Sequence, residues 1–127
     1  MSIPYSVAVS LIKEKSFIDE YTDEAISDNM VLSLANKVNV FEDYNINDLV
    51  PNKRPAIVEI KTKNGENYKE RVDFPKGEPE NPLTKEEIES KFISLATYGN
   101  KTYSEAEKII ECVWDIENKI DELFQLL

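Results

Sequence analysis

The chain has 127 residues, 41% hydrophobic and 31% charged, a composition typical of one globular domain and not of a disordered segment. Fifteen Lys and Arg against 25 Asp and Glu give a net charge of −10, which disfavours nucleic acid and anionic membrane surfaces as partners. The absence of His excludes the Ser–His and Cys–His pairs of nucleophilic enzymes, and the single Cys excludes an internal disulfide.

A first helix is predicted over residues 4–14. Pro4 is favourable in the first turn of a helix, and Ser2 is suited to cap it. Its apolar residues point all round the helix: Tyr5, Val7, Ala8, Val9, Leu11 and Ile12. We therefore expect an apolar surface around Tyr5, Val9 and Ile12 that needs cover and favours self-association.

Further helical segments and one strand are predicted before the middle of the chain. Residues 17–26 indicate a short amphipathic segment, and the apolar spacing over residues 30–38 indicates another helix. Residues 38–41 are predicted to continue as a strand. A loop is expected over residues 45–53, followed by Pro55.

A β-hairpin is predicted over about residues 55–74, because apolar and polar residues alternate on both sides of Asn64-Gly65. A two-residue turn would place Ile60 opposite Lys69 and the apolar rows on opposite faces. A three-residue loop, residues 63–65 with Gly65 left-handed, brings these rows to one face. The pairs that this register creates are Ile60–Tyr68, Ala56–Val72, Glu59–Lys69 and, with an acid in the apolar row, Val58–Glu70.

Two helices are predicted at the C-terminal end. Thr84 and Glu87 form the capping-box pattern of a helix over residues 84–96. Ser104 and Glu107 repeat that pattern for the last helix. Its apolar residues recur in steps of three and four as a single seam to the end of the chain.

The order of these elements predicts an α+β fold. A small antiparallel sheet, including the hairpin, packs with helices in a single domain over residues 1–127. No apolar run approaches the length of a membrane span, and residues 1–12 lack the cationic leader of a signal peptide. The cytoplasm is therefore the expected location, with no membrane partner.

Three segments together resemble the MmgE/PrpD family, which includes 2-methylcitrate dehydratase, cis-aconitate decarboxylase and iminodisuccinate epimerase. Residues 2–11, SIPYSVAVSL, are similar to the family's FS-x-PY-x-VA-x-AL helix. Residues 71–84, RVDFPKGEPENPLT, are similar to its strand-exit loop. The following helix continues that motif with Glu87, Lys91-Phe92 and Leu95-Ala96. The resemblance covers nearly the whole chain and only the family's smaller, C-terminal α+β domain.

The resemblance implies a two-domain lyase or isomerase that acts on small di- or tricarboxylates without a metal or other cofactor. A helical N-terminal domain brings most of the catalytic groups, including His and Lys, and the smaller domain closes over the cleft. This chain has no His, and Met1 stands where the family has an aromatic residue. We therefore interpret it as an excised or separately encoded C-terminal domain that is inactive alone and has the helical domain and a carboxylate substrate as partners. The alternative is a free-standing module that binds a partner or itself.

The start of the first helix is the main candidate site. A helix N-terminus carries N–H groups and a partial positive charge suited to a substrate carboxylate, and Ser2 is the substrate-binding candidate there. Tyr5 is the catalytic candidate, because the resemblance places it where the family has a tyrosine facing the cleft. The alternative for Tyr5 is an ordinary core residue.

The proline-rich loop supplies two further substrate-binding candidates. Lys76 and Gly77 offer an ammonium group and backbone N–H groups to an anion. The alternative is that Gly77 only allows a tight bend. Cys112 is interpreted as a structural thiol. No metal site is expected, because the acidic pairs, such as Asp19-Glu20, are interpreted as solvated helix faces.

Overall fold

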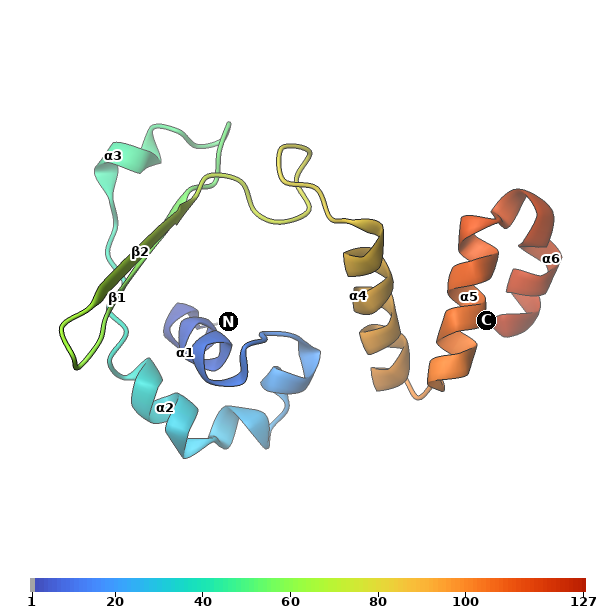
Figure 1. Cartoon of the computed structure of the whole chain (residues 1–127), viewed down its shortest axis with the longest axis horizontal. Helices are drawn as coiled ribbons and strands as arrows, with labels where there is room; N and C mark the ends of the chain where they lie inside the picture. Colours follow the sequence, from blue (N-terminus) through green and yellow to red (C-terminus); the bar gives the residue numbers. More distant parts are fainter. Residues whose placement is uncertain (1) are drawn as a thin grey trace. The chain divides into compact units, whose positions relative to one another are not determined.

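The computed structural model describes residues 2–127. Over this range it contains six α-helices, two short 3-10 helices and one two-stranded antiparallel sheet, which confirms the predicted α+β class (Figure 1). The elements are α1 (Ile3–Lys13), η1 (Ile18–Tyr21), η2 (Ala25–Ser27), α2 (Asn29–Ala35), α3 (Tyr44–Asn47), β1 (Ala56–Lys61), β2 (Asn67–Val72), α4 (Lys85–Tyr98), α5 (Tyr103–Trp114) and α6 (Ile116–Leu126).

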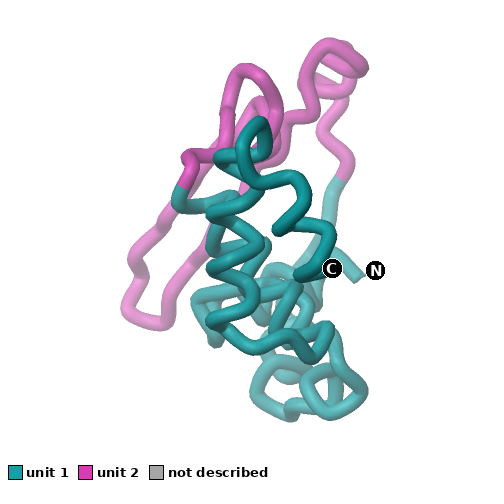
Figure 2. The backbone as a smooth tube through the Cα atoms, turned by 90° about the vertical axis from the view of Figure 1, so that its right-hand side faces the viewer, with its two compact units in different colours: residues 1–41, 86–127 teal, residues 42–85 magenta. Residues whose placement is uncertain are grey.

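The chain divides into two compact units (Figure 2). Unit 1 comprises residues 1–41 and 86–127, and unit 2 comprises residues 42–85. Unit 1 therefore contains the N-terminal and C-terminal helices, whereas unit 2 contains the hairpin and the loops on either side of it. That residues 1–127 form a single domain stays a prediction.

Helix α1 begins as predicted from its capping residue. The hydroxyl oxygen of Ser2 accepts a hydrogen bond from the Tyr5 N–H at 3.4 Å, and Pro4 lies in the first turn. The helix ends where Glu14 adopts the left-handed conformation, with φ 56°. The helix thus lies within one residue of the predicted range at each end.

The core of residues 2–41 forms where α1 packs against α2. Tyr5, Ala8 and Val9 are buried with Val31 of α2, and Ile12 is partly buried beside them. The expectation of an uncovered apolar surface at these positions is therefore wrong. The cover comes from α2, because Asp28 caps that helix and pairs with Lys13 of α1 at 2.9 Å, which closes the two helices together.

Two local predictions before the hairpin are also wrong. Residues 38–41 form no strand, because β1 and β2 pair only with each other within the described chain, and a strand needs a partner for its backbone groups. The predicted loop at residues 45–53 begins inside a short helix, α3. The Asp43 carboxylate starts this helix by accepting a hydrogen bond from the Asn45 N–H at 2.9 Å.

The hairpin has the predicted register. The Thr62 N–H donates to the Glu66 carbonyl at 2.9 Å, so residues 63–65 form a three-residue loop. Gly65 has φ 88°, the positive value that this loop requires. The observed pairs are Ala56–Val72, Val58–Glu70, Glu59–Lys69 and Ile60–Tyr68. Alternation of polar and apolar residues therefore determined the loop length correctly.

The capping box of helix α5 (Tyr103–Trp114) lies two residues before the predicted one. The Glu105 N–H donates to the Thr102 hydroxyl oxygen at 3.2 Å, and the Thr102 N–H donates to the Glu105 carboxylate at 2.7 Å. The box is therefore Thr102 with Glu105, and the Ser104–Glu107 prediction is wrong. Both pairs have the same spacing, so the pattern alone did not distinguish them. Thr102 has the extended backbone of a capping residue, with φ −72° and ψ 157°, whereas Ser104 lies inside the helix.

The single seam predicted for the last helix is interrupted at Asp115, which has φ −123° and ψ 38°. After Asp115, α6 turns back along α5, and the Lys101 ammonium donates to the Leu126 carbonyl at 2.8 Å (Figure 1). This packing helps to bury one row of α5. The buried residues of that row are Ala106, Ile109 and Cys112. Burial of apolar surface therefore outweighs the continuity of one long helix.

Truncation of Val31 tests the packing of α1 on α2. We expect Val31→Ala to lower the free energy of unfolding by about 1.5–3 kcal/mol, because two buried methyl groups leave a cavity. The neighbouring Met30 is exposed, so Met30→Ala is the matched control and should change stability little. Urea unfolding followed by circular dichroism measures both. Equal effects of the two substitutions would contradict the packing.

Candidate functional site

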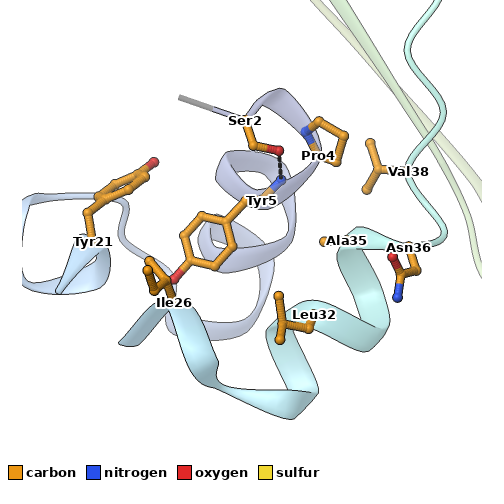
Figure 3. A pocket seen from close by; sticks show the side chains of 9 residues that line it. All are labelled: Ser2, Pro4, Tyr5, Tyr21, Ile26, Leu32, Ala35, Asn36 and Val38. Carbon is orange, nitrogen blue, oxygen red and sulfur yellow. Dashed lines mark hydrogen bonds between the residues drawn. The ribbon is translucent and has the colours of Figure 1, made fainter. Parts of the chain in front are cut away.

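A surface hollow beside the start of α1 contains two of the four predicted site residues (Figure 3). Its volume is about 690 Å³, and it lies entirely within residues 2–38. The first turn of α1, the 3-10 segment and α2 supply its walls. The lining residues are Ser2, Pro4, Tyr5, Tyr21, Ile26, Leu32, Ala35, Asn36 and Val38.

Ser2 fixes the edge of this hollow by organising the first turn of α1. Its carbonyl oxygen accepts hydrogen bonds from the N–H of Ser6 at 3.0 Å and from the Ser6 hydroxyl at 3.1 Å. Pro4 has no N–H, and the N–H of Tyr5 is already bonded to Ser2. The start of α1 therefore has few N–H groups left to donate, and what it offers to an anion is mainly its partial positive charge.

Tyr5 belongs both to the buried core and to the lining of the hollow. Its side chain is 8% exposed, and its hydroxyl donates to the carbonyl oxygens of Glu20 at 2.6 Å and Ala25 at 3.1 Å. Figure 3 shows its ring extending from α1 toward Ile26. Burial, reinforced by the negative charge of Asp28 and Glu20, raises the pKa of the phenol, which therefore stays protonated at neutral pH.

This arrangement limits what the Tyr5 hydroxyl can do. It has one proton, and that proton is directed at two backbone carbonyl groups. The oxygen keeps a lone pair with which it can accept a bond from a ligand. Donation of the proton to a substrate would require Tyr5 to exchange its bonds to the segment of residues 20–25.

Tyr21 is a part of the hollow that the sequence did not single out. Its ring meets that of Tyr5 edge to face, with the centroids 5.5 Å apart. Its hydroxyl lies within hydrogen-bond distance of two other hydroxyl groups, those of Ser6 at 2.9 Å and Ser16 at 2.7 Å. These three hydroxyl groups form a polar border next to Tyr5. No local spacing links residues 6 and 21, so no sequence signal indicated this group.

Glu20 corrects the prediction that the acidic pairs are solvated. Its side chain is 5% exposed, accepts a hydrogen bond from the Phe17 N–H at 3.0 Å and pairs with Lys15 at 2.8 Å. The Lys15 ammonium holds the pKa of this carboxyl below its ordinary value, against the opposing effect of burial. Glu20 is buried because its side chain caps η1. Its backbone carbonyl oxygen accepts the hydrogen bond from the Tyr5 hydroxyl.

Lys76 and Gly77 lie in unit 2, on the loop after β2. Gly77 has φ 101°, which an L side chain rarely adopts, and its N–H donates to the Asn81 carbonyl at 2.8 Å. The Asn81 amide in turn donates to the Phe74 carbonyl at 2.9 Å. The Gly77 N–H therefore closes a tight bend, and Lys76 stands exposed at its start. The structure thus brings Ser2 and Tyr5 together, whereas Lys76 and Gly77 belong to the other unit.

Other reactive groups offer no second centre in the described part of the chain. Cys112 is buried, and burial raises the pKa of its thiol, as expected of a structural cysteine. Residues 2–127 contain no cluster of three or more His, Cys, Asp or Glu side chains suited to a metal ion. No helix in this range is both long enough and apolar enough to cross a membrane.

The hollow is lined by residues of the SIPYSVAVSL motif and of the following segment that packs on α1. The model of the MmgE/PrpD C-terminal domain matches residues 1–116. The chain therefore belongs to the MmgE/PrpD family. This confirms the resemblance that the sequence motifs indicate, and the match includes residues of both units. No curated protein and no solved structure matches the chain.

Removal of the Tyr5 hydroxyl tests its bonds to the backbone. We expect Tyr5→Phe to lower the free energy of unfolding by about 1–3 kcal/mol, because the buried Glu20 carbonyl loses its donor. Tyr44 is exposed, so Tyr44→Phe removes a hydroxyl without this effect and serves as the control. Urea unfolding measures both variants, and an unchanged Tyr5→Phe protein would refute the assignment.

From the lowered pKa of the Glu20 carboxyl we predict a specific loss of stability in acid. A carboxyl whose pKa is lower in the folded than in the unfolded chain stabilises the fold above its ordinary pKa of 4.5. That contribution is lost as the pH falls below 4.5 and through the lowered pKa. We therefore expect Glu20→Gln to flatten the decline in stability over this window, measured by urea unfolding at successive pH values. Glu24→Gln, at an exposed position, should leave the decline unchanged.

Proposed function

We propose that this chain is the C-terminal domain of a lyase or isomerase that acts on small di- or tricarboxylates, of the kind represented by 2-methylcitrate dehydratase. In this proposal it closes over an active site to which a helical N-terminal domain of the same family contributes most catalytic groups. The family match over residues 1–116, together with a hollow beside Ser2 and Tyr5, carries the proposal.

The proposed chemistry is proton abstraction next to a carboxylate, followed by elimination, decarboxylation or epimerisation. The chain has no His, the usual base at neutral pH, so the base is assigned to the helical domain. Tyr5 is a neutral phenol at that pH, because its pKa is raised. It is therefore unsuited to act as a tyrosinate base. In the proposal it stabilises developing negative charge by donating a hydrogen bond, for which it must first give up its bonds to the Glu20 and Ala25 carbonyl oxygens.

The binding groups are proposed to act on the carboxylates of the substrate. The partial positive charge at the start of α1 favours an anion, and Ser2 holds that helix end in place. Lys76 carries a positive charge on the Gly77 loop of unit 2 and is a separate candidate for binding an anion. These groups require no metal. The cytoplasm is the compartment we propose for the assembled enzyme.

A second candidate function is a free-standing interaction or self-association module derived from this domain. Exposed apolar side chains favour it, among them Ile3 and Leu11 on α1 and Phe124 on α6. The two functions differ in what they require. An enzyme requires the helical domain for turnover, whereas the module acts without it.

Reconstitution with the helical domain tests the first proposal. We expect the chain to co-purify with a co-expressed MmgE/PrpD helical domain and the pair to dehydrate 2-methylcitrate, while either part alone is inactive. Tyr5→Phe should lower kcat about 10²-fold without loss of co-purification, since it removes one donor to the developing charge. Tyr44→Phe is the control and should retain full turnover. Failure of the two domains to associate would favour the interaction module.

A further inference from the structure

Two cations meet on one carboxylate in unit 2, at the end of the hairpin away from its loop. The Arg71 Nε–H donates to one oxygen of Asp73 at 2.6 Å, and the Lys53 ammonium donates to the other at 2.8 Å. The backbone keeps the two segments side by side, because the Arg54 N–H donates to the Asp73 carbonyl at 3.1 Å just beyond the last pair of the ladder. We call Lys53, Arg71 and Asp73 the Asp73 cluster.

Further contacts orient the cations of the Asp73 cluster. The Lys53 ammonium lies 5.4 Å from the centroid of the Phe74 ring, and the Phe74 carbonyl accepts a hydrogen bond from the Asn81 amide at 2.9 Å. Arg71 and Lys53 hold the pKa of the Asp73 carboxyl below its ordinary value, so this carboxyl stays ionised at neutral pH. Both cations are therefore held in place before any ligand binds.

The cations keep hydrogen-bond donors that Asp73 does not use. A guanidinium has five N–H groups and an ammonium has three. Arg71 binds Asp73 through Nε, which leaves its two terminal Nη groups, and such a pair can bind both oxygens of one anion. The Arg71 side chain is 47% exposed and that of Lys53 38%, so a solute can reach both. Within residues 2–127, no acid other than Asp73 pairs with either cation.

The charge at the Asp73 cluster is positive, in contrast to most of the chain. Two cations and one acid give the cluster +1. The hairpin face that carries Arg71 adds two more cations and one acid, and the pair beside it is balanced: Lys61, Lys69 and Glu59, and Arg54 with Glu78 at 3.9 Å. Residues 42–85 contain eight cations and nine acids, whereas the rest of the chain contains seven and sixteen. The cluster is therefore a place where an anion is attracted to this acidic protein.

We propose that Arg71 and Lys53 bind a small oxyanion, a carboxylate or a phosphate. The Nη groups of Arg71 donate to two oxygens of the anion, and the Lys53 ammonium adds a charge-assisted hydrogen bond. Asp73 is the positioning residue, because it orients both cations. The site shares no residue with the hollow beside Tyr5 and needs no base, so it does not depend on the reaction proposed above.

Titration of the full chain at constant ionic strength tests this site. The probes are succinate and inorganic phosphate at pH 7.5, followed by NMR shifts of the backbone amides. We expect saturable shifts at Arg71 and Asp73 with at least one probe, and the probe with the lower Kd identifies the class of oxyanion. Arg71→Gln should raise that Kd at least tenfold. Arg71→Lys should raise it nearly as much, because an ammonium keeps the charge and loses the paired donors.

Matched variants separate this site from general attraction to positive charge. Lys69→Gln removes a cation from the same face of β2 and should retain the Kd of the parent chain. Urea unfolding of each variant shows whether the hairpin is intact. An absence of saturable shifts with both probes would overturn the proposal, as would equal Kd values for Arg71→Gln and Lys69→Gln. So would binding that Lys76→Gln abolishes and Arg71→Gln leaves unchanged, since the anion would then lie on the Gly77 loop.

Discussion

The hydrogen bonds from the Tyr5 hydroxyl to the Glu20 and Ala25 carbonyl oxygens are the constraint on which the N-terminal site depends. They tie the first turn of α1 to the 3-10 segment, and that segment leads directly into α2. The packing of Val31 and the pair between Lys13 and Asp28 then close α2 onto α1. The hollow is the space left beside this junction, so its shape is set by the same contacts that hold the core.

Tyr5 both packs in the core and lines the candidate site, which explains how the two can coincide. A tyrosine has an apolar ring and one polar tip, and here the ring is buried with Val9 while the tip is bonded to the Glu20 and Ala25 carbonyl oxygens; Tyr5 also lines the hollow. A substrate carboxylate that accepts a hydrogen bond from the Tyr5 phenol must compete with two backbone carbonyl groups. In the proposed enzyme, binding of a carboxylate at Tyr5 and movement of residues 20–25 would therefore be linked.

Local patterns predicted the parts of the fold that depend on neighbouring residues. Ser2 and Pro4 located the start of α1, and alternation gave the hairpin register. Two of the failures depend on partners distant in sequence, because α2 covers Tyr5 and α6 turns back along α5 after Asp115. The burial of Glu20 instead involves the nearby residues Phe17 and Lys15, in a turn that no spacing of acidic residues indicated. Likewise, the sequence indicated Ser2 and Tyr5 but not Tyr21, whose bond to Ser6 joins residues fifteen positions apart.

The central claim is that this domain and a helical partner share one carboxylate site. Linkage requires that a substrate bound by both domains strengthens their association. The most direct measurement is the Kd between the chain and the MmgE/PrpD helical domain, determined by calorimetry with and without 2-methylcitrate. The account predicts tighter association in the presence of the carboxylate and a smaller gain for Tyr5→Phe. An identical Kd under both conditions would contradict it.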